Sequence, residues 1–368
     1  MIRVLHAADL HLDSPFQALG REKALQRRGE QRKLLTRIAD AAREHRADIA
    51  VFAGDLFDAE DIFSDTGRMI GQVFTAMEIP VFIAPGNHDW YGPRSAWTRL
   101  ELGGNVHLFT GEAVECVELA DLGVRVWGTA FTGRYRTPPL RDFEAEKDGD
   151  IVDILVAHGE VGDPSSRYGA ITEEQLRRCG MDYVALGHIH SFSGLRRAGE
   201  TFYAWPGCPE GRGFDETGEK GVILAELSPG ECRLEFLPVA ARRYEIRAVD
   251  VTDAPDIAAA AEAALPPENA EDIVRLILTG QTDAAPEPAV LRGRLEGRCF
   301  ALDLRDETTP RRDIWAERGT DSLKGLFLAY LWDRLQATPG EAGRKKIRQA
   351  AKYGLAAMEN ADEPSLLG

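Results

Sequence analysis

The sequence has few cysteines and no long apolar run. Its five cysteines, at positions 116, 179, 208, 232 and 299, lie at least 24 residues apart and form no CxxC pair. This spacing argues against a disulfide framework and against a cysteine-rich zinc site. No apolar run approaches the ~20 residues of a membrane helix, and Asp9 interrupts the segment where a signal peptide would have its apolar core. These absences predict a cytoplasmic protein with no membrane-bound part.

The sequence also has fewer basic than acidic residues. The chain has 44 Lys and Arg residues against 60 Asp and Glu residues, which gives a net charge of −16 at pH 7. This balance argues against a protein that binds nucleic acid over its whole surface, although a local basic patch or bound metal ions can still hold a phosphate substrate. The other proportions, 44% hydrophobic and 28% charged residues over 368 positions, are ordinary for a globular protein of two or three domains.

Apolar runs alternate with helical segments at the start of the chain. Strands are expected at 2–7, 49–53 and 80–84, with helices at 21–46 and 66–77 between them. This β-α-β-α-β order predicts a layered α/β fold. The apolar runs that follow are too close together for helices to separate all of them, so part of the sheet structure is expected to be antiparallel.

A change of pattern at 238–243 indicates a domain boundary. We expect one domain over 1–238, a small α+β domain over 242–305 and a helical segment over 321–360. The first C-terminal helix has apolar residues at helical spacing, so it either packs within its own domain or offers an anchor to a partner. The elements expected after the boundary are strands at 244–251, 272–279, 291–295 and 299–304, an Ala-rich helix at 256–265, a linker at 284–288, and helices at 321–337 and 340–359.

Five of the apolar runs end in polar side chains that can bind metal ions. Ligand sites in open α/β sheets form beyond the carboxyl ends of the strands, so we expect these side chains to converge. Oxygen and imidazole ligands without thiolates suit Mn²⁺, Fe or Zn²⁺. Seven ligands are too many for one ion, but a shared carboxylate lets them hold two ions ~4 Å apart, as in two-metal phosphoester hydrolysis. The segments are Asp9-Leu10-His11, Gly54-Asp55, Gly86-Asn87-His88, Ala157-His158 and Gly187-His188-Ile189-His190.

The order of these motifs carries a family resemblance. DxH, GDxxD, GNHD, a strand-terminal HG and GHxH follow one another as in the calcineurin-like metallophosphoesterases, which the chain resembles over 1–237. The stretches HAADLHLDSPF and EGRGFDETGEKG are similar to those of the bacterial branch of SbcD/YhaO-type DNA repair exonucleases. The resemblance implies a layered metallophosphoesterase sandwich with mixed sheets over 1–238, then the capping domain of that branch over 242–305 and C-terminal helices over 321–360.

Each candidate ligand takes a role from this resemblance. Two divalent metal ions are implied, Mn²⁺ in the first place, with Fe or Zn²⁺ as alternatives. One carboxylate would bridge the two ions, and three residues would complete each site. The implied ligands are Asp9, His11 and His190 for one ion, Asn87, His158 and His188 for the other, and Asp55 as the bridge.

Two further residues are implied to act in catalysis. His88 would lie outside the metal ligands and donate a proton to the leaving oxygen, and Asp58 would hold His88 through a side-chain hydrogen bond. Archaeal and eukaryotic nucleases of the family have His where this chain has Asp58, whereas the bacterial SbcD-type nucleases and many phosphatases have Asp. The alternative for Asp58 is that it only caps its turn.

The stretch 211–221 is rich in glycine and has two interpretations. It either closes over the site or is only a turn. Arg212, like the arginines of other nearby loops, either contacts a phosphate group or belongs to the solvated surface.

The resemblance implies a DNA exonuclease or endonuclease that works in DNA repair with an SbcC-like coiled-coil ATPase. The first alternative is a phosphodiesterase or phosphatase for small molecules on the same metal centre. The negative net charge favours it, because an acidic surface repels long DNA. A second alternative is a scaffold that binds DNA ends, but the complete set of ligands argues against it. Whether the protein forms a homodimer is left open.

Overall fold

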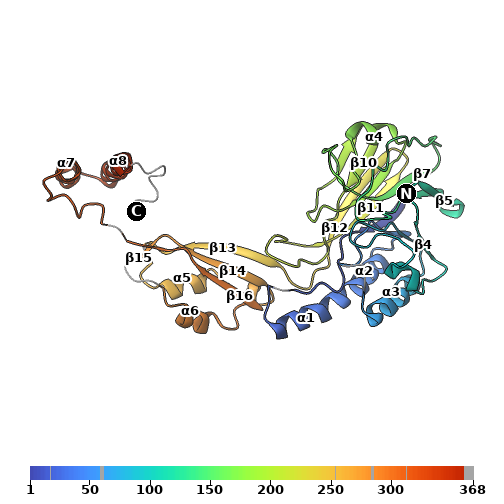
Figure 1. The fold of residues 1–368 in the computed structure, drawn as a ribbon, viewed down its shortest axis with the longest axis horizontal. Coiled ribbons are helices and arrows are strands. Elements are labelled where there is room, and N and C mark those ends of the chain that lie inside the picture. Colours follow the sequence, from blue (N-terminus) through green and yellow to red (C-terminus); the bar gives the residue numbers. More distant parts are fainter. Residues whose placement is uncertain (17, 59–61, 253, 283–285, 312, 360–368) are drawn as a thin grey trace. The chain divides into compact units, whose positions relative to one another are not determined.

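The computed structural model describes residues 1–16, 18–58, 62–252, 254–282, 286–311 and 313–359. Contacts divide the chain into two compact units (Figure 1). The first comprises Met1–Glu245 with Glu271–Ile273, and the second comprises Ile246–Ala270 with the chain from Val274 onward. The second unit holds most of the predicted capping domain together with the C-terminal helices, and the finer division into three domains stays a prediction.

The first unit contains two six-stranded sheets. Their strand orders are β12-β11-β1-β2-β3-β4 and β5-β6-β7-β8-β10-β9. In the first sheet β1, β2, β3 and β4 are parallel, and β11 and β12 are added antiparallel. In the second sheet the four inner strands are parallel and both edge strands are antiparallel.

The bounds of these strands follow the apolar runs of the sequence. The first sheet consists of β1 (Ile2–Ala7), β2 (Ile49–Phe52), β3 (Val81–Ile83), β4 (Val106–Leu108), β11 (Gly221–Ser228) and β12 (Glu231–Pro238). The second consists of β5 (Glu115–Leu119), β6 (Val124–Gly128), β7 (Val152–His158), β8 (Tyr183–Gly187), β9 (Arg196–Ala198) and β10 (Thr201–Ala204).

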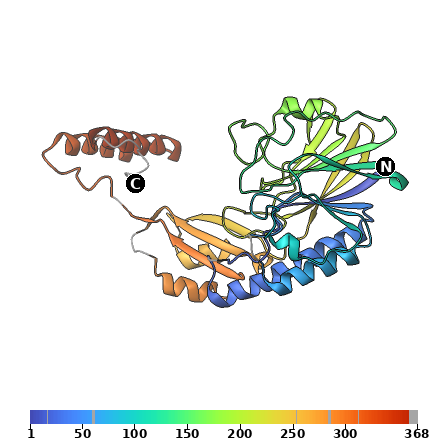
Figure 2. The same ribbon diagram turned by 45° about the vertical axis from the view of Figure 1, so that its right-hand side comes forward.

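Helices cover the outer face of each sheet (Figure 2). Successive residues of a strand point to opposite faces, so Leu5 of β1 packs among the helices whereas Val4 packs between the sheets. Each fully buried side chain such as Ile38 stabilises this packing by roughly 1.5–3 kcal/mol. The helices are α1 (Arg21–Arg32), α2 (Leu34–Glu44) and α3 (Ser64–Ala76) by the first sheet and α4 (Glu173–Arg178) by the second, with short 3₁₀ turns at Ala96–Arg99 and Ala120–Leu122.

Among its described residues, the second unit contains a three-stranded sheet of order β13-β14-β16 and four α-helices. Two of the helices pack on the sheet through Ala261, Leu291 and Leu295. The C-terminal pair packs through Leu328, Leu331 and Leu335 against Ala351 and Leu355. The elements are β13 (Tyr244–Asp250), α5 (Ile257–Ala263), a 3₁₀ turn (Pro267–Asn269), β14 (Ile273–Thr279), β15 (Gln281–Thr282), α6 (Pro288–Leu295), β16 (Ala301–Asp306), β17 (Thr309–Pro310), α7 (Leu323–Ala337) and α8 (Glu341–Glu359).

The structure confirms the layered α/β fold with mixed sheets and corrects two local predictions. The strand predicted at 291–295 is wrong, because these residues belong to α6. Leu291 and Leu295 lie four residues apart on one helical face, and Pro288 stands at the helix start, where proline is favoured. The helix predicted at 21–46 is interrupted at Lys33. Of the predicted linker at 284–288, residues 284 and 285 lie outside the described residues.

None of the helices in the described ranges is both long and apolar enough to span a bilayer.

Candidate metal centre

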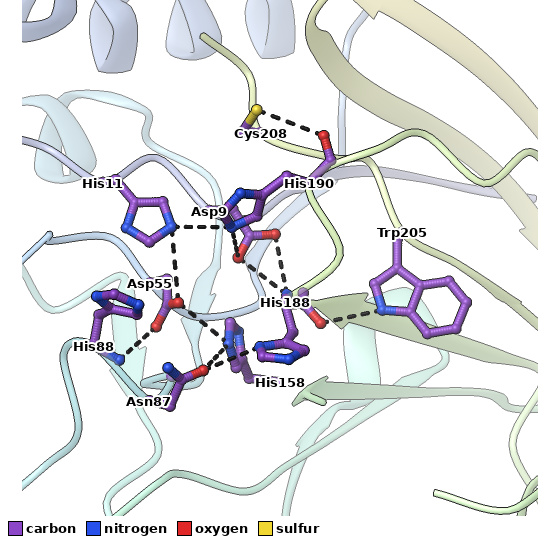
Figure 3. A network of polar contacts seen from close by, with 12 residues as sticks. Asp9, His11, Asp55, Asn87, His88, His158, His188, His190, Trp205 and Cys208 are labelled. Atoms are coloured by element: carbon purple, nitrogen blue, oxygen red, sulfur yellow. Dashed lines mark hydrogen bonds and ion pairs between the residues drawn. The ribbon is translucent and has the colours of Figure 1, made fainter. Parts of the chain in front are cut away.

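Polar side chains from five strand ends meet at one place in the first unit (Figure 3). Three of the strands belong to the first sheet and two to the second, so the site lies where the strand ends of both sheets come together. The side chains are Asp9 and His11 after β1, Asp55 after β2, Asn87 and His88 after β3, His158 at the end of β7, and His188 and His190 after β8.

Asp9, His11 and His190 form one group of candidate ligands, in which one ligand atom from each lies within 4.8 Å of the others. The Nε2 atoms of His11 and His190 are 3.2 Å apart. Asp9 Oδ1 lies 3.9 Å from His190 Nε2. Asp9 and His11 are fully buried whereas His190 is partly exposed, so one side of this group faces the protein interior and the other faces solvent.

Asp55, Asn87, His158 and His188 form the second group. His158 Nε2 lies 3.4 Å from Asp55 Oδ2 and 3.0 Å from Asn87 Oδ1. His188 Nδ1 lies 3.1 Å from the same Asn87 oxygen. Asp55 Oδ2 is also 3.8 Å from His11 Nε2, so this carboxylate lies between the two groups. The structure thus brings all seven candidate ligands together.

The outer ring nitrogens of three histidines face protein oxygens. His158 Nδ1 donates to the main-chain oxygen of Ala53 at 2.8 Å, and its Nε2 faces the Asn87 and Asp55 oxygens. His190 Nδ1 donates to Glu216 Oε1 at 2.8 Å, and His11 Nδ1 lies 3.2 Å from Asp58 Oδ1. The Nε2 atoms of His11 and His190 face each other at 3.2 Å. Ring nitrogens come this close when a cation or a proton lies between them. Imidazole nitrogens together with carboxylate and amide oxygens are ligands that suit Mn²⁺, Fe or Zn²⁺.

Burial and neighbouring charges set the ionisation of the carboxylates and imidazoles. Burial raises the pKa of the Asp9 carboxyl above its usual range. Burial acts in the same direction on Asp55, but the imidazoles of His158 and His11 outweigh it and hold the Asp55 pKa well below its usual range. For His158, burial lowers the pKa, and the Asp55 and Asp9 carboxylates outweigh that effect and raise the pKa to about 9. The ionised Asp55 carboxylate is thus balanced by the His158 imidazolium, and a divalent cation can balance this carboxylate in place of the histidine proton.

Four of the candidate ligands have left-handed backbone conformations. Their φ angles are 55° at Asp9, 43° at His11, 52° at Asp55 and 95° at His188. Such conformations cost ~1–3 kcal/mol each in residues other than glycine and cluster at functional sites. A neighbouring glycine supplies the space, because a Cβ atom on Gly86 would overlap the Asp55 carboxylate.

The predicted hydrogen bond between the Asp58 and His88 side chains is wrong. His88 Nδ1 lies 3.3 Å from the main-chain oxygen of Asp58. The Asp58 carboxylate instead lies 3.2 Å from His11 Nδ1 and accepts a hydrogen bond from Arg212 Nη1 at 3.0 Å. The guanidinium charge favours this position of the carboxylate over a neutral imidazole partner. The catalytic roles of Asp58 and His88 stay predictions.

A model of the calcineurin-like phosphoesterase family matches residues 2–192, which hold the whole set of strand-end ligands. The chain belongs to the calcineurin-like phosphoesterases. The resemblance noted in the sequence is therefore confirmed. Membership makes the protein a phosphoric ester hydrolase that uses divalent metal ions, in agreement with the ligand groups of the structure.

Three relatives are similar to this phosphoesterase over most of its length. The metallophosphoesterase YhaO of Bacillus subtilis (strain 168) is 31% identical over 337 residues, which cover 86% of this chain and 81% of that protein. The SbcD component of the nuclease SbcCD from the same strain is 26% identical over 280 residues, covering 62% of this chain and 67% of that protein. The DNA double-strand break repair protein Mre11 of Aeropyrum pernix is 29% identical over 275 residues, covering 69% of this chain and 64% of that protein.

Three residues without a role in the sequence prediction hold the candidate ligands of this phosphoesterase in place. The Asp89 carboxylate accepts hydrogen bonds from the main-chain N–H groups of Gly86 and Leu56, both at 2.7 Å, and of Asp55 at 3.2 Å. Trp205 Nε1 donates to the main-chain oxygens of Gly159 and Gly187, each next to a ligand histidine. Glu216 accepts from His190. Asp89 closes the GNHD motif and Glu216 lies in the EGRGFDETGEKG stretch, so both could have been suspected.

The Asp89→Asn variant tests whether this carboxylate fixes the two loops. Asn can accept hydrogen bonds at one side-chain oxygen, so its amide group will face at least one main-chain N–H of Gly86, Leu56 or Asp55. We expect a loss of ~1–3 kcal/mol in the free energy of unfolding, together with weaker metal binding. Urea denaturation and metal analysis of the purified variant measure both. Asp13→Asn is the control, since Asp13 bonds to Phe63 and Thr66. An Asp89→Asn variant as stable as the control would contradict the assignment.

Proposed function

We propose that the protein is a DNA exonuclease or endonuclease that hydrolyses phosphodiester bonds at a centre of two divalent ions, of which Mn²⁺ is the first choice. The observation that carries the proposal is the position of Asp55 between two ligand groups. That pairing suits hydrolysis of phosphate esters by two ions. The named nuclease relatives, SbcD and Mre11, support DNA as the substrate and DNA repair as the setting.

The proposal assigns the seven ligands as the resemblance implies. Divalent ions bound here would supply Lewis acid chemistry, which polarises the phosphate and makes a water molecule more acidic. The protein's own contribution is to hold the ligand atoms with their lone pairs converging. The Asp55 main chain is held by Asp89, and the Asp55 Oδ1 atom accepts from the main-chain N–H of His88 at 2.9 Å. The assigned ligands are Asp9, His11 and His190 for one ion, Asn87, His158 and His188 for the other, and Asp55 for both.

His88 is the exposed histidine of the centre and the proposed donor of a proton to the leaving oxygen. Its ring lies edge-on to that of His11, with ring centres 4.9 Å apart, and its Nδ1 is near the Asp58 main-chain oxygen. A main-chain oxygen accepts from Nδ1–H and thereby favours one tautomer of the neutral ring. Asp58 then supports the centre through His11 and not through the His88 imidazole.

The C-terminal helices supply the proposed surface for an SbcC-like coiled-coil ATPase. One face of α7 packs on α8, whereas Leu323, Leu326 and Tyr330 are between 59% and 76% exposed. These three residues recur at helical spacing and form one apolar face, which suits an anchor in a groove of a partner. The relative SbcD is by its name one component of the larger nuclease SbcCD, which supports a partner of this kind.

Asp55→Ala tests the two-ion assignment. Losing the shared carboxylate should remove most of the bound metal and all measurable cleavage, while the largely hydrophobic sandwich stays folded. Mn²⁺ content by mass spectrometry and cleavage of end-labelled duplex DNA are the measurements, with Asp13→Ala as control. Two ions retained per chain would contradict the assignment.

Turnover of a small chromogenic phosphodiester by the unaltered protein, without DNA cleavage, would favour the small-molecule alternative.

His88→Ala tests the proton donor. A dialkyl phosphodiester or DNA needs a proton on its leaving oxygen, so its hydrolysis should slow ~10²–10⁴-fold. A nitrophenyl ester leaves as a stable anion, so its hydrolysis should fall much less, with metal content unchanged. Parallel kcat measurements on both substrates give the comparison, with His45→Ala as the control for a histidine outside the centre. Equal losses on the two substrates would show that His88 is no proton donor.

Leu326→Glu combined with Tyr330→Glu tests the partner surface. Both side chains are exposed, so hydrolysis of DNA and the melting temperature should not change. The complex with a co-expressed SbcC-like ATPase should be lost in size-exclusion chromatography. The control is Tyr353→Glu, an exposed position on α8. A complex that survives in the double variant excludes this face as the contact.

A further inference from the structure

Arg212 forms ion pairs with two carboxylates, and each carboxylate contacts a different histidine of the first ligand group. Its Nη1 donates to Asp58 Oδ1 at 3.0 Å. Its Nη2 donates to Glu216 Oε1 at 2.6 Å and also lies 3.2 Å from His190 Nδ1. The Nε atom lies 3.2 and 3.3 Å from the two Glu216 oxygens, and the Arg212 main-chain N–H donates to Glu216 Oε2 at 2.8 Å. One guanidinium therefore fixes both carboxylates.

Each of these carboxylates contacts the outer nitrogen of a candidate metal ligand. Asp58 Oδ1 lies 3.2 Å from His11 Nδ1, and Glu216 Oε1 accepts from His190 Nδ1 at 2.8 Å. The inner Nε2 atoms of the same two histidines face each other at 3.2 Å. The five side chains thus close a ring of contacts in the order His11, Asp58, Arg212, Glu216, His190.

We propose that Arg212, Asp58 and Glu216 form a brace that fixes the ring orientation of His11 and His190, so that residues outside the metal ligands govern the affinity of the first ion. The proposal rests on the ligand assignment given under the proposed function. Carboxylates on the outer nitrogens of ligand histidines set the tautomer and the direction of the lone pair. Arg212 is a positioning residue in this scheme, because it acts through the two carboxylates and through its contact with His190 Nδ1.

The contacts of Arg212 argue against a direct role in holding the substrate phosphate. Both edges of its guanidinium face carboxylates, and its side chain is only 20% exposed. Two carboxylates around one cation leave a negative sum of charge, which does not attract a phosphate group. The planar guanidinium group of Arg212 donates to two carboxylates at once, which a lysine ammonium group cannot do with the same geometry.

The chain supplies a matched comparison in Glu210, six residues before Glu216. Glu210 is also buried and ion-paired, since it accepts from Arg27 Nη2 and Arg37 Nη2, both at 2.6 Å. Its further partner among the described residues is the main-chain N–H of Ala241, and none of these partners is a histidine. A change at Glu210 removes a buried ion pair of the same kind without reaching the brace.

The experiment titrates the full-length, metal-free protein with Mn²⁺ alone and measures bound ions by equilibrium dialysis. Electron paramagnetic resonance distinguishes an exchange-coupled pair of ions from a single ion. We expect two ions in the unaltered protein. In Arg212→Met one of the two should bind ~10–100-fold more weakly, with the coupled signal replaced by that of a single ion at limiting Mn²⁺. Glu210→Gln should lower the melting temperature and leave both affinities unchanged.

Glu216→Gln keeps the proposal testable if Arg212→Met does not fold. The Gln side-chain oxygen can still accept from His190 Nδ1 but forms no ion pair with Arg212, so we expect a smaller loss of affinity at the same ion. Two ions with unchanged affinity in both variants would overturn the brace, as would an equal loss in Glu210→Gln. Fewer than two ions in the unaltered protein would overturn the ligand assignment itself. Loss at one ion without any DNA cleavage by the unaltered protein would support the brace and reject the nuclease.

Discussion

The arrangement of this phosphoesterase depends on one electrostatic constraint, namely that several buried polar ligand atoms must be held close together. The two facing imidazole nitrogens are 3.2 Å apart, and Asn87 Oδ1 lies 3.0 Å from His158 Nε2. In a buried site such contacts are unfavourable unless positive charge lies among them. The surrounding loops must therefore be rigid enough to keep the ligands together and must point each lone pair inward.

A buried hydrogen-bonded contact between β1 of the first sheet and β8 of the second sheet helps to meet this requirement. His6 of β1 is fully buried between them and contacts the Tyr183 hydroxyl at 2.9 Å and the Leu186 main-chain oxygen at 3.1 Å. Burial lowers the His6 pKa to about 3, so the ring is neutral and can donate at one nitrogen while it accepts at the other. This bond ties the strand that precedes Asp9 to the strand that precedes His188, so the two halves of the centre keep their spacing.

The candidate ligands could be predicted from the sequence because each one directly follows an apolar run, and a strand end is a local feature. The contacts between loops could not be predicted in this way. Asp58 was expected beside His88 and lies beside His11, because Arg212 comes from 154 positions further along the chain and draws the carboxylate to it. The strand expected at 291–295 failed for a different reason. In so short a segment, Leu291, Gly293 and Leu295 satisfy the alternation of a strand as well as the spacing of a helix.

The left-handed ligand residues have a consequence for the abundance of the active protein. Four such residues raise the free energy of the folded state by ~1–3 kcal/mol each, and an ion that binds only the folded state lowers it by ~2.7 kcal/mol at a hundredfold excess over its dissociation constant. The two quantities are of the same order. By mass action, a bound ion therefore offsets part of this strain, so a shortage of the ion lowers the stability of the folded chain and its resistance to proteolysis as well as stopping the reaction.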